Sequence, residues 1–146
     1  TPGKAIDKRI VANRIVELWS KYKPEEIAFD QWGMNELQRI LSEEDKPDLA
    51  FRPWGQGFKS MSPATKSFEE LVLNRQLIHD GNQLLAWSVK NVRMETDAAE
   101  NKKPSKARSR ERIDPAVASI MAVGLASVME AQKPKFQCFF VGGPSK

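Results

Sequence analysis

The stretch Ile27-Ala28-Phe29-Asp30 decides the fold that this sequence predicts, because an apolar run ends there in an acidic residue. The three apolar residues predict a short buried strand. Asp30 then stands at the carboxyl end of that strand, which is where sites form in open α/β sheets. An aspartate in this position suits a metal ion, although the spacing Asp-x-x-Gly over residues 30–33 is also typical of a turn.

Patterns on both sides of this strand predict alternating helices and strands. Apolar residues at helical spacing indicate helices over residues 7–22, 34–44, 62–74, 83–91 and 115–132. Weaker apolar runs indicate short strands over residues 48–51, 77–79 and 92–96, with a loop over 52–57. Pro24 ends the first helix, and Ser62-Pro63 is a typical helix start. The alternation predicts an α/β layer fold with helices on both faces of the sheet.

The composition is that of one globular domain with a mild preference for an anionic partner. The chain has 146 residues, 40% hydrophobic and 29% charged, and a net charge of +4. Its single cysteine, Cys138, argues against a disulfide framework and fits a reducing compartment. The longest apolar stretch, residues 116–129, is too short to span a bilayer, so no membrane is expected. Because the chain starts at Thr1 without a methionine, we interpret it as a piece of a longer protein.

Asp114 is the second candidate acidic ligand. The pair Asp114-Pro115 is how many helices begin, with the aspartate as cap and the proline at the first helical position. One carboxylate oxygen can cap a helix while the other binds an ion, so both interpretations stay open. An acid at a strand end that faces an acid at a helix start can hold a divalent metal ion against phosphate.

A basic stretch lies between the two aspartates. Residues 97–112 are polar, charged and without periodicity, which predicts a loop or mobile segment. Its cations could neutralise the phosphates of a nucleic acid, or they could simply be solvated loop charges. They are Lys102, Lys103, Lys106, Arg108, Arg110 and Arg112.

Other chemical motifs have weaker support. His79 is the only histidine, so packing or a turn hydrogen bond is expected of it rather than zinc binding or catalysis. Gly55-Gln56-Gly57 resembles a phosphate loop only superficially, and its glycines favour a tight turn. Three tryptophans could stack on bases, although tryptophans at such spacings usually lie in a core: Trp32, Trp54 and Trp87.

Several words of the sequence, in order over residues 1 to about 130, resemble the large subunit of tailed-phage terminases, the DNA-packaging motor. These words are Thr1-Pro2-Gly3 with Ile6-Asp7, Ile27-Ala28-Phe29-Asp30-Gln31-Trp32, Gly55-Gln56-Gly57-Phe58-Lys59-Ser60-Met61-Ser62-Pro63-Ala64, Leu77-Ile78-His79-Asp80-Gly81-Asn82, Trp87 with Asn91, and Lys106 leading to Arg112-Ile113-Asp114. An alanine-rich helix follows the last word. The ordered set is more specific than any one of its members.

The resemblance implies a C-terminal nuclease domain with a ribonuclease H-like fold, a mixed sheet flanked by helices. Such a domain cuts concatemeric double-stranded DNA during genome packaging with two divalent ions, Mg²⁺ or Mn²⁺, held by acidic residues. By resemblance, Asp30 and Asp114 are metal-binding and catalytic acids, and Lys106 with its basic neighbours meets the DNA backbone. Pro115 stands where the family often has glycine.

The same resemblance implies a partial domain. The family's first metal-binding acid lies on a strand upstream of Thr1, so the chain alone is expected to lack part of the site. Residues 1–132 then form a nuclease domain without its first strands, and residues 133–146 a C-terminal tail. The implied partners are double-stranded DNA, the terminase small subunit and the portal protein, in the cytoplasm of the bacterial host.

Two other classes of protein stay open on the sequence. A non-catalytic DNA-binding or packaging-assembly module needs only the basic surface. A helical scaffold would lack the buried strand at Ile27. The nuclease interpretation, in contrast, requires Asp30 and Asp114 to converge.

Overall fold

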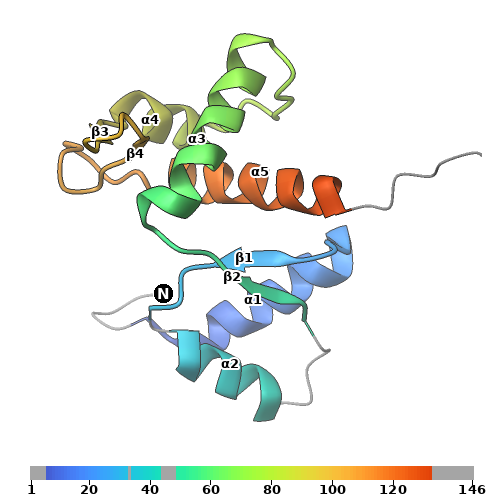
Figure 1. Ribbon diagram of the computed structural model, residues 1–146. Coiled ribbons are helices and arrows are strands. Elements are labelled where there is room, and N and C mark those ends of the chain that lie inside the picture. Colours follow the sequence, from blue (N-terminus) through green and yellow to red (C-terminus); the bar gives the residue numbers. More distant parts are fainter. Residues whose placement is uncertain (1–5, 33, 44–48, 133–146) are drawn as a thin grey trace, which may run out of the picture.

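The computed structural model describes residues 6–32, 34–43 and 49–132. Helices and short strands alternate along this part of the chain, so the predicted mixed α/β class is confirmed (Figure 1). The elements are α1 (Lys8–Tyr22), β1 (Ile27–Phe29), α2 (Met34–Glu43), β2 (Phe51–Pro53), α3 (Phe58–Leu73), α4 (Gln83–Asn91), β3 (Met94–Thr96), β4 (Lys102–Pro104) and α5 (Asp114–Gln132).

The parallel pair β1–β2 lies at the centre, with α1 and α2 on one side and α5 on the other (Figure 1). The rings of Phe29 and Phe51 meet edge to face at 5.8 Å on this pair. Phe51 packs against the core of α1 and α2, whereas Ala28 packs against the core that contains α5. Because side chains alternate along a strand, Glu26 and Asp30 are on the same side of β1 as Ala28.

Two apolar cores hold these layers together. The smaller core joins α1, α2 and the residue that leads into β2, and it consists of Ala12, Leu37, Ile40, Leu41 and Leu49. The larger core joins α3 and α5, and it consists of Trp54, Met61, Ala64, Phe68, Ile113, Val117, Ile120, Met121 and Leu125. Helices therefore cover both faces of the β1–β2 pair, as the alternation predicts.

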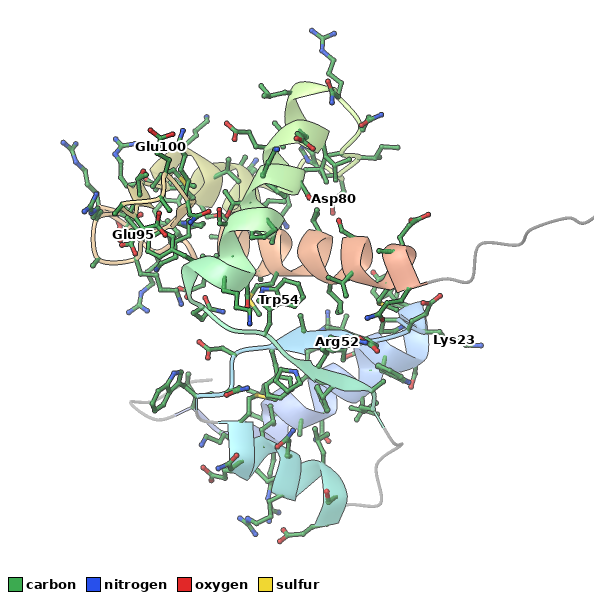
Figure 2. All side chains as sticks on the ribbon, in the orientation of Figure 1. Lys23, Arg52, Trp54, Asp80, Glu95 and Glu100 are labelled. Atoms are coloured by element: carbon green, nitrogen blue, oxygen red, sulfur yellow. The ribbon has the colours of Figure 1, made fainter. Side chains whose placement is uncertain are left out.

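Helices α5 and α3 approach each other closely at Gly124 of α5. A Cβ atom at Gly124 would lie 2.5 Å from the Cβ of Ala64 and 2.7 Å from the ring atom Cζ2 of Trp54. Figure 2 shows Trp54 at the junction between the strand layer and α3. Only a residue without a side chain fits there, so this glycine sets how closely α5 packs on α3.

The start of α3 differs from the prediction. The helix begins at Phe58 with Gly57 as its N-cap residue, and Pro63 lies inside it. Ser62 is therefore not a cap. Its Oγ accepts a hydrogen bond from the backbone N–H of Lys102 at 3.3 Å, and it joins α3 to the hairpin instead. Core packing by Met61, which is 2% exposed, outweighs the local capping signal of Ser62-Pro63.

The sequence predicted a loop over the whole basic segment 97–112. The structure differs, because the segment contains β4. This strand pairs antiparallel with β3, and both oxygens of Asp97 accept hydrogen bonds from Asn101 across the turn. The backbone N–H of Ser105 continues the ladder to the carbonyl of Arg93 at 2.8 Å. The three residues Lys-Lys-Pro carry no alternating pattern of apolar and polar side chains, so the strand depends on its pairing. The mobility of the segment stays a prediction.

The remaining differences concern short elements. Among the described residues the strands form two separate pairs, β1–β2 and β3–β4, rather than one mixed sheet. The strand predicted over 48–51 begins at Phe51 instead, and the one predicted over 77–79 is absent. The turn at Asp80-Gly81-Asn82 is confirmed, with Gly81 at a φ of 77°. The predicted tail over 133–146, with Cys138, lies outside the described residues.

Helix α5 is longer than its apolar run. At 19 residues with a mean hydropathy of 1.3, it is long and apolar enough to cross a membrane by length and composition alone, so the sequence argument from length was wrong. A core helix passes the same test. Six residues of α5 are buried, and the helix packs on α3, α4 and β1, which is the arrangement of a core helix.

We expect Gly124→Ala to destabilise the protein. Overpacking of this kind costs about 1–3 kcal/mol, which exceeds the roughly 1 kcal/mol that alanine gains over glycine inside a helix. Thermal unfolding followed by circular dichroism measures the change. Gly57→Ala is the matched control, because nothing lies within 4 Å of a Cβ atom there. An equal or larger loss in the control would contradict the close contact at Gly124.

Candidate functional site

A cavity of about 610 Å³ lies between β1 and α5. Ala28 and other apolar side chains form most of its wall, and Asp30, Gln56, Lys106 and Asp114 are among its polar lining residues. Asp30 and Asp114 come from distant parts of the sequence, and the packing of α5 on β1 brings both to this cavity. The geometry thus unites the two acids that the sequence singles out.

Asp30 sits in the turn that follows β1. Its Oδ1 atom accepts a hydrogen bond from the backbone N–H of Trp32 at 3.2 Å, which is the turn role considered from the sequence. The carbonyl of Phe29 accepts a hydrogen bond from the N–H of Trp54 at 2.8 Å and holds the strand end in place. Asp30 therefore caps its own turn and also lines the cavity, so the two interpretations coexist.

Asp114 belongs to the first turn of α5 rather than to the cap position. The carbonyl of Ile113 accepts the first helical hydrogen bond, from the N–H of Val117 at 3.0 Å. The side chain of Asp114 instead forms an ion pair with Lys106, whose Nζ lies 2.7 Å from Oδ1. The hydrogen bond from Lys106 lowers the pKa of Asp114 below its ordinary value, and Arg112 adds to this effect. Asp114 is therefore ionised at neutral pH.

A second cavity of about 310 Å³ adjoins the first on the side of the β3–β4 hairpin. Asp30, Gln56, Lys106 and Val117 line both cavities. The second cavity adds Glu95 of β3, which is seen on the hairpin in Figure 2. Sequence reasoning missed Glu95, because only the pairing of β3 with β4 brings that carboxylate to the site.

Glu95 is held by the hairpin itself. Its Oε1 atom lies 2.7 Å from Nζ of Lys103, with both side chains about a quarter exposed or less. Hydrogen bonds from Lys103 and Ser105 lower the pKa of Glu95 below its ordinary value. The ammonium of Lys103 also lies 5.2 Å from the ring centre of Phe58, at the start of α3. The ion pair thus joins the two strands of the hairpin, and the contact of Lys103 with Phe58 links the hairpin to α3.

The six basic candidates are therefore not equivalent. Lys103 and Lys106 are engaged with carboxylates, Glu95 and Asp114 respectively. The other four are exposed, and none forms an ion pair with another described residue: Lys102, Arg108, Arg110 and Arg112. These four leave positive charge available beside the cavity.

His79 and Trp54 take the roles that the sequence favoured, whereas Trp32 and Trp87 are exposed rather than in a core. Nδ1 of His79 accepts a hydrogen bond from the N–H of Gly81 at 3.0 Å, so the expected turn role is confirmed. Trp54 is buried in the larger core. Trp32, in contrast, is 90% exposed, two residues from Asp30, and was wrongly expected in a core.

The donor set at the cavity suits a hard divalent cation. Carboxylate oxygens are the preferred ligands of Mg²⁺ and Mn²⁺, and Asp30 and Asp114 supply them. Within the described ranges no three histidine, cysteine, aspartate or glutamate side chains come together as a metal-binding group. A pair of metal ions would therefore need further ligands besides these two acids.

Comparisons with known proteins identify the family to which this mixed α/β fold with its acidic cavity belongs. The sequence model of the family described as "Terminase large subunit, endonuclease domain" matches residues 1–130. The chain therefore belongs to the terminase large subunit endonuclease domain family, as the ordered words predict.

Two relatives and one solved structure are similar to this chain in sequence or in fold. The terminase large subunit of Enterobacteria phage HK97 is 33% identical over 127 residues, which are 87% of this chain and 25% of the relative. Protein YmfN of Escherichia coli K12 is 30% identical over 135 residues, 90% of this chain and 29% of the relative. The crystal structure of the HK97 large terminase superimposes with a TM-score of 0.79 at 33% identity, covering 86% of this chain and 26% of that one. The chain thus spans about a quarter of the length of these relatives.

We expect Lys106→Gln to raise the pKa of Asp114 towards its ordinary value, because the hydrogen bond from Lys106 is the main cause of the depression. A lowered pKa in the folded state adds stability above the ordinary pKa, and this stability is lost as the pH falls through the folded pKa. The difference in stability between wild type and variant should therefore vanish in acid.

Titration of the Asp114 carboxyl carbon by NMR measures this pKa directly. Arg110→Gln is the control, since Arg110 is not among the groups that shift the pKa of Asp114. An unchanged Asp114 pKa in Lys106→Gln would refute the ion pair.

Proposed function

We propose that this chain is the core of a metal-dependent endonuclease domain that cuts concatemeric double-stranded DNA during phage genome packaging. The observation that carries this proposal is the convergence of Asp30 and Asp114 on one cavity. Membership of the terminase endonuclease family supports it. The TM-score of 0.79 against the HK97 large terminase supports a shared fold, for which we propose the ribonuclease H-like type.

In this proposal Asp30 and Asp114 hold Mg²⁺ or Mn²⁺. Bound there, such ions would activate water and stabilise the leaving oxygen of a phosphodiester. Asp114 suits this role, because its lowered pKa keeps the carboxylate ionised. Lys106, paired with Asp114, keeps a positive charge at the cavity and so offsets the repulsion between these acids and a DNA phosphate.

We further propose that an additional strand, with a third acid, joins the free edge of β1. The bonds from Ile27 N–H to Ala50 and from Trp54 N–H to Phe29 use the edge of β1 that faces β2. In a parallel pair the backbone groups of the intervening Ala28 point to the opposite edge. The outer edge of β2 carries Pro53, which has no N–H to donate, so an added strand pairs more favourably beside β1.

DNA would lie over the exposed cations next to the cavity. Lys102, Arg108, Arg110 and Arg112 can contact phosphates without reading sequence. The exposed ring of Trp32 stands beside Asp30 and can stack on a base or sugar. This arrangement predicts affinity with little sequence preference, and a strong dependence of affinity on salt.

The partners proposed for the intact protein follow from the family. A terminase large subunit would work with the terminase small subunit and the portal protein, in the cytoplasm of the bacterial host. A second candidate function is a non-catalytic DNA-binding or assembly module. The specific observation in its favour is that no three histidine, cysteine, aspartate or glutamate side chains of the described residues come together as a metal-binding group, although Asp30 and Asp114 line one cavity.

Mn²⁺ should raise the melting temperature of this chain, and Asp30→Ala should abolish the increase. A ligand at 100 times its dissociation constant stabilises the folded state by about 2.7 kcal/mol. Asp80→Ala is the matched control, because Asp80 lies in a turn away from the cavity. An equal increase in the melting temperature of wild type and Asp30→Ala on addition of Mn²⁺ would show that Asp30 is not a metal ligand.

Asp114→Asn should abolish metal-dependent cleavage in a complete nuclease domain. A suitable protein is a chimera in which this chain replaces the matching quarter of the HK97 large subunit. Plasmid cutting with Mn²⁺ is followed on agarose gels, with Asp80→Asn as control. Wild-type rates in Asp114→Asn would refute the assignment, and a folded chimera that binds DNA without cutting it would favour the non-catalytic module.

A further inference from the structure

Gln56 stands at the junction of the two cavities. It is one of four residues that line both, and the other three are Asp30, Lys106 and Val117. Its position follows from the turn Gly55-Gln56-Gly57, which leads from β2 into α3. The side chain is partly buried and faces the same space as the two candidate acids. The sequence offered no role for this residue beyond its place in a tight turn.

The amide of Gln56 has one weak partner among the described residues. Its Nε2 donates to the thioether sulfur of Met121 at 3.2 Å, and a thioether is a weak acceptor. An amide can make up to four hydrogen bonds, so most of its capacity stays available within this part of the chain. The contact with Met121 orients the side chain along α5, and a stronger acceptor in the cavity would displace it at little cost.

The backbone around Gln56 restricts where the amide can go. The next residue, Gly57, caps α3, and its carbonyl accepts a hydrogen bond from the N–H of Met61 at 3.0 Å. Met61 itself is 2% exposed in the larger core. The amide is thus mounted on a rigid helix start, as a binding group needs to be if it is to be positioned before its ligand arrives.

A neutral donor has an advantage in this cavity. A cation placed between two carboxylates pairs with them, as Lys106 does with Asp114. An amide N–H carries no net charge, so it stays available for an incoming anion. A phosphate oxygen suits such a donor, because its negative charge makes it a strong hydrogen-bond acceptor.

We infer that Gln56 binds a non-bridging oxygen of the DNA phosphodiester at the site of cutting, which rests on the function proposed above. The amide exchanges the Met121 sulfur for the phosphate oxygen and holds the phosphodiester between Asp30 and Asp114. Because negative charge on that oxygen increases as water adds to phosphorus, the contact strengthens in the transition state and acts on kcat.

Gln56→Met tests this inference, since methionine keeps the length of the side chain and removes the amide. In the HK97 chimera with Mn²⁺ we expect kcat to fall about 10- to 100-fold, the loss typical of one hydrogen bond to a charged group. The melting temperature should stay within about 2 °C, because the Met121 contact is weak. Gln83→Met, at the exposed start of α4, is the matched control and should cut as wild type.

A second measurement does not depend on cutting. In ¹⁵N-labelled protein the side-chain amide signals of Gln56 are identified by their loss in Gln56→Met, and a short DNA duplex is then added. We expect the Gln56 signals to move in a saturable way and those of Gln83 to stay in place. Stationary Gln56 signals, while backbone signals around Asp30 move, would overturn the inference.

The two measurements separate the inference from the proposed function. Wild-type cutting in Gln56→Met, or a loss of activity that follows a loss of folding, would overturn the role of Gln56 and leave the nuclease function intact. If the wild-type chimera does not cut, the proposed function fails, and the amide signals alone decide whether Gln56 contacts a phosphate.

Discussion

The close packing of α5 is the constraint on which the rest of the structure depends. One face of this helix meets α3 at Gly124, where Ala64 and Trp54 leave no room for a Cβ atom. Asp114 lies in the first turn of α5. The following turns of α5 line one side of the cavity, and β1 and Asp30 line the other side. Burial of this apolar helix therefore does two things at once. It forms the larger core, and it fixes the acid at its N-terminal end relative to the acid at the end of β1.

The electrostatics of the cavity follow from this placement. Asp30 and Asp114 line one cavity, and negative charge there repels an anionic substrate. Lys106 offsets part of this charge by pairing with Asp114, and the Lys103–Glu95 pair does the same on the hairpin. Positive side chains outside these pairs then remain for the phosphate backbone. The chain thus combines carboxylates that line one cavity with cations outside these ion pairs, and the metal and DNA binding that we propose depends on these two features.

The sequence predicted the elements whose signals are local and repeated. The ranges of α1, α2, α4 and α5 agree with the structure to within one residue where both are described, because apolar spacing and capping residues act within a few positions. The prediction failed for elements whose bounds depend on contacts between residues far apart in the chain. Ser62-Pro63 carries a good capping signal, yet Met61 and Phe58 extend α3 towards the core and the hairpin. Lys102–Pro104 has no strand pattern, and it becomes a strand only through its pairing with β3.

By itself, the sequence determined the α/β class, the family and the two candidate acids. The reason is that these depend on apolar spacing and on short motifs in a fixed order, which can be recognised without knowing the contacts in space. Only the tertiary structure decided that Asp30 and Asp114 line one cavity, that Lys106 pairs with Asp114, and that Glu95 and Gln56 face the same region. The physical reason is that these relations join residues far apart in the chain. These contacts form only after α5 has packed against both α3 and β1. A local sequence pattern does not predict which distant residues will meet.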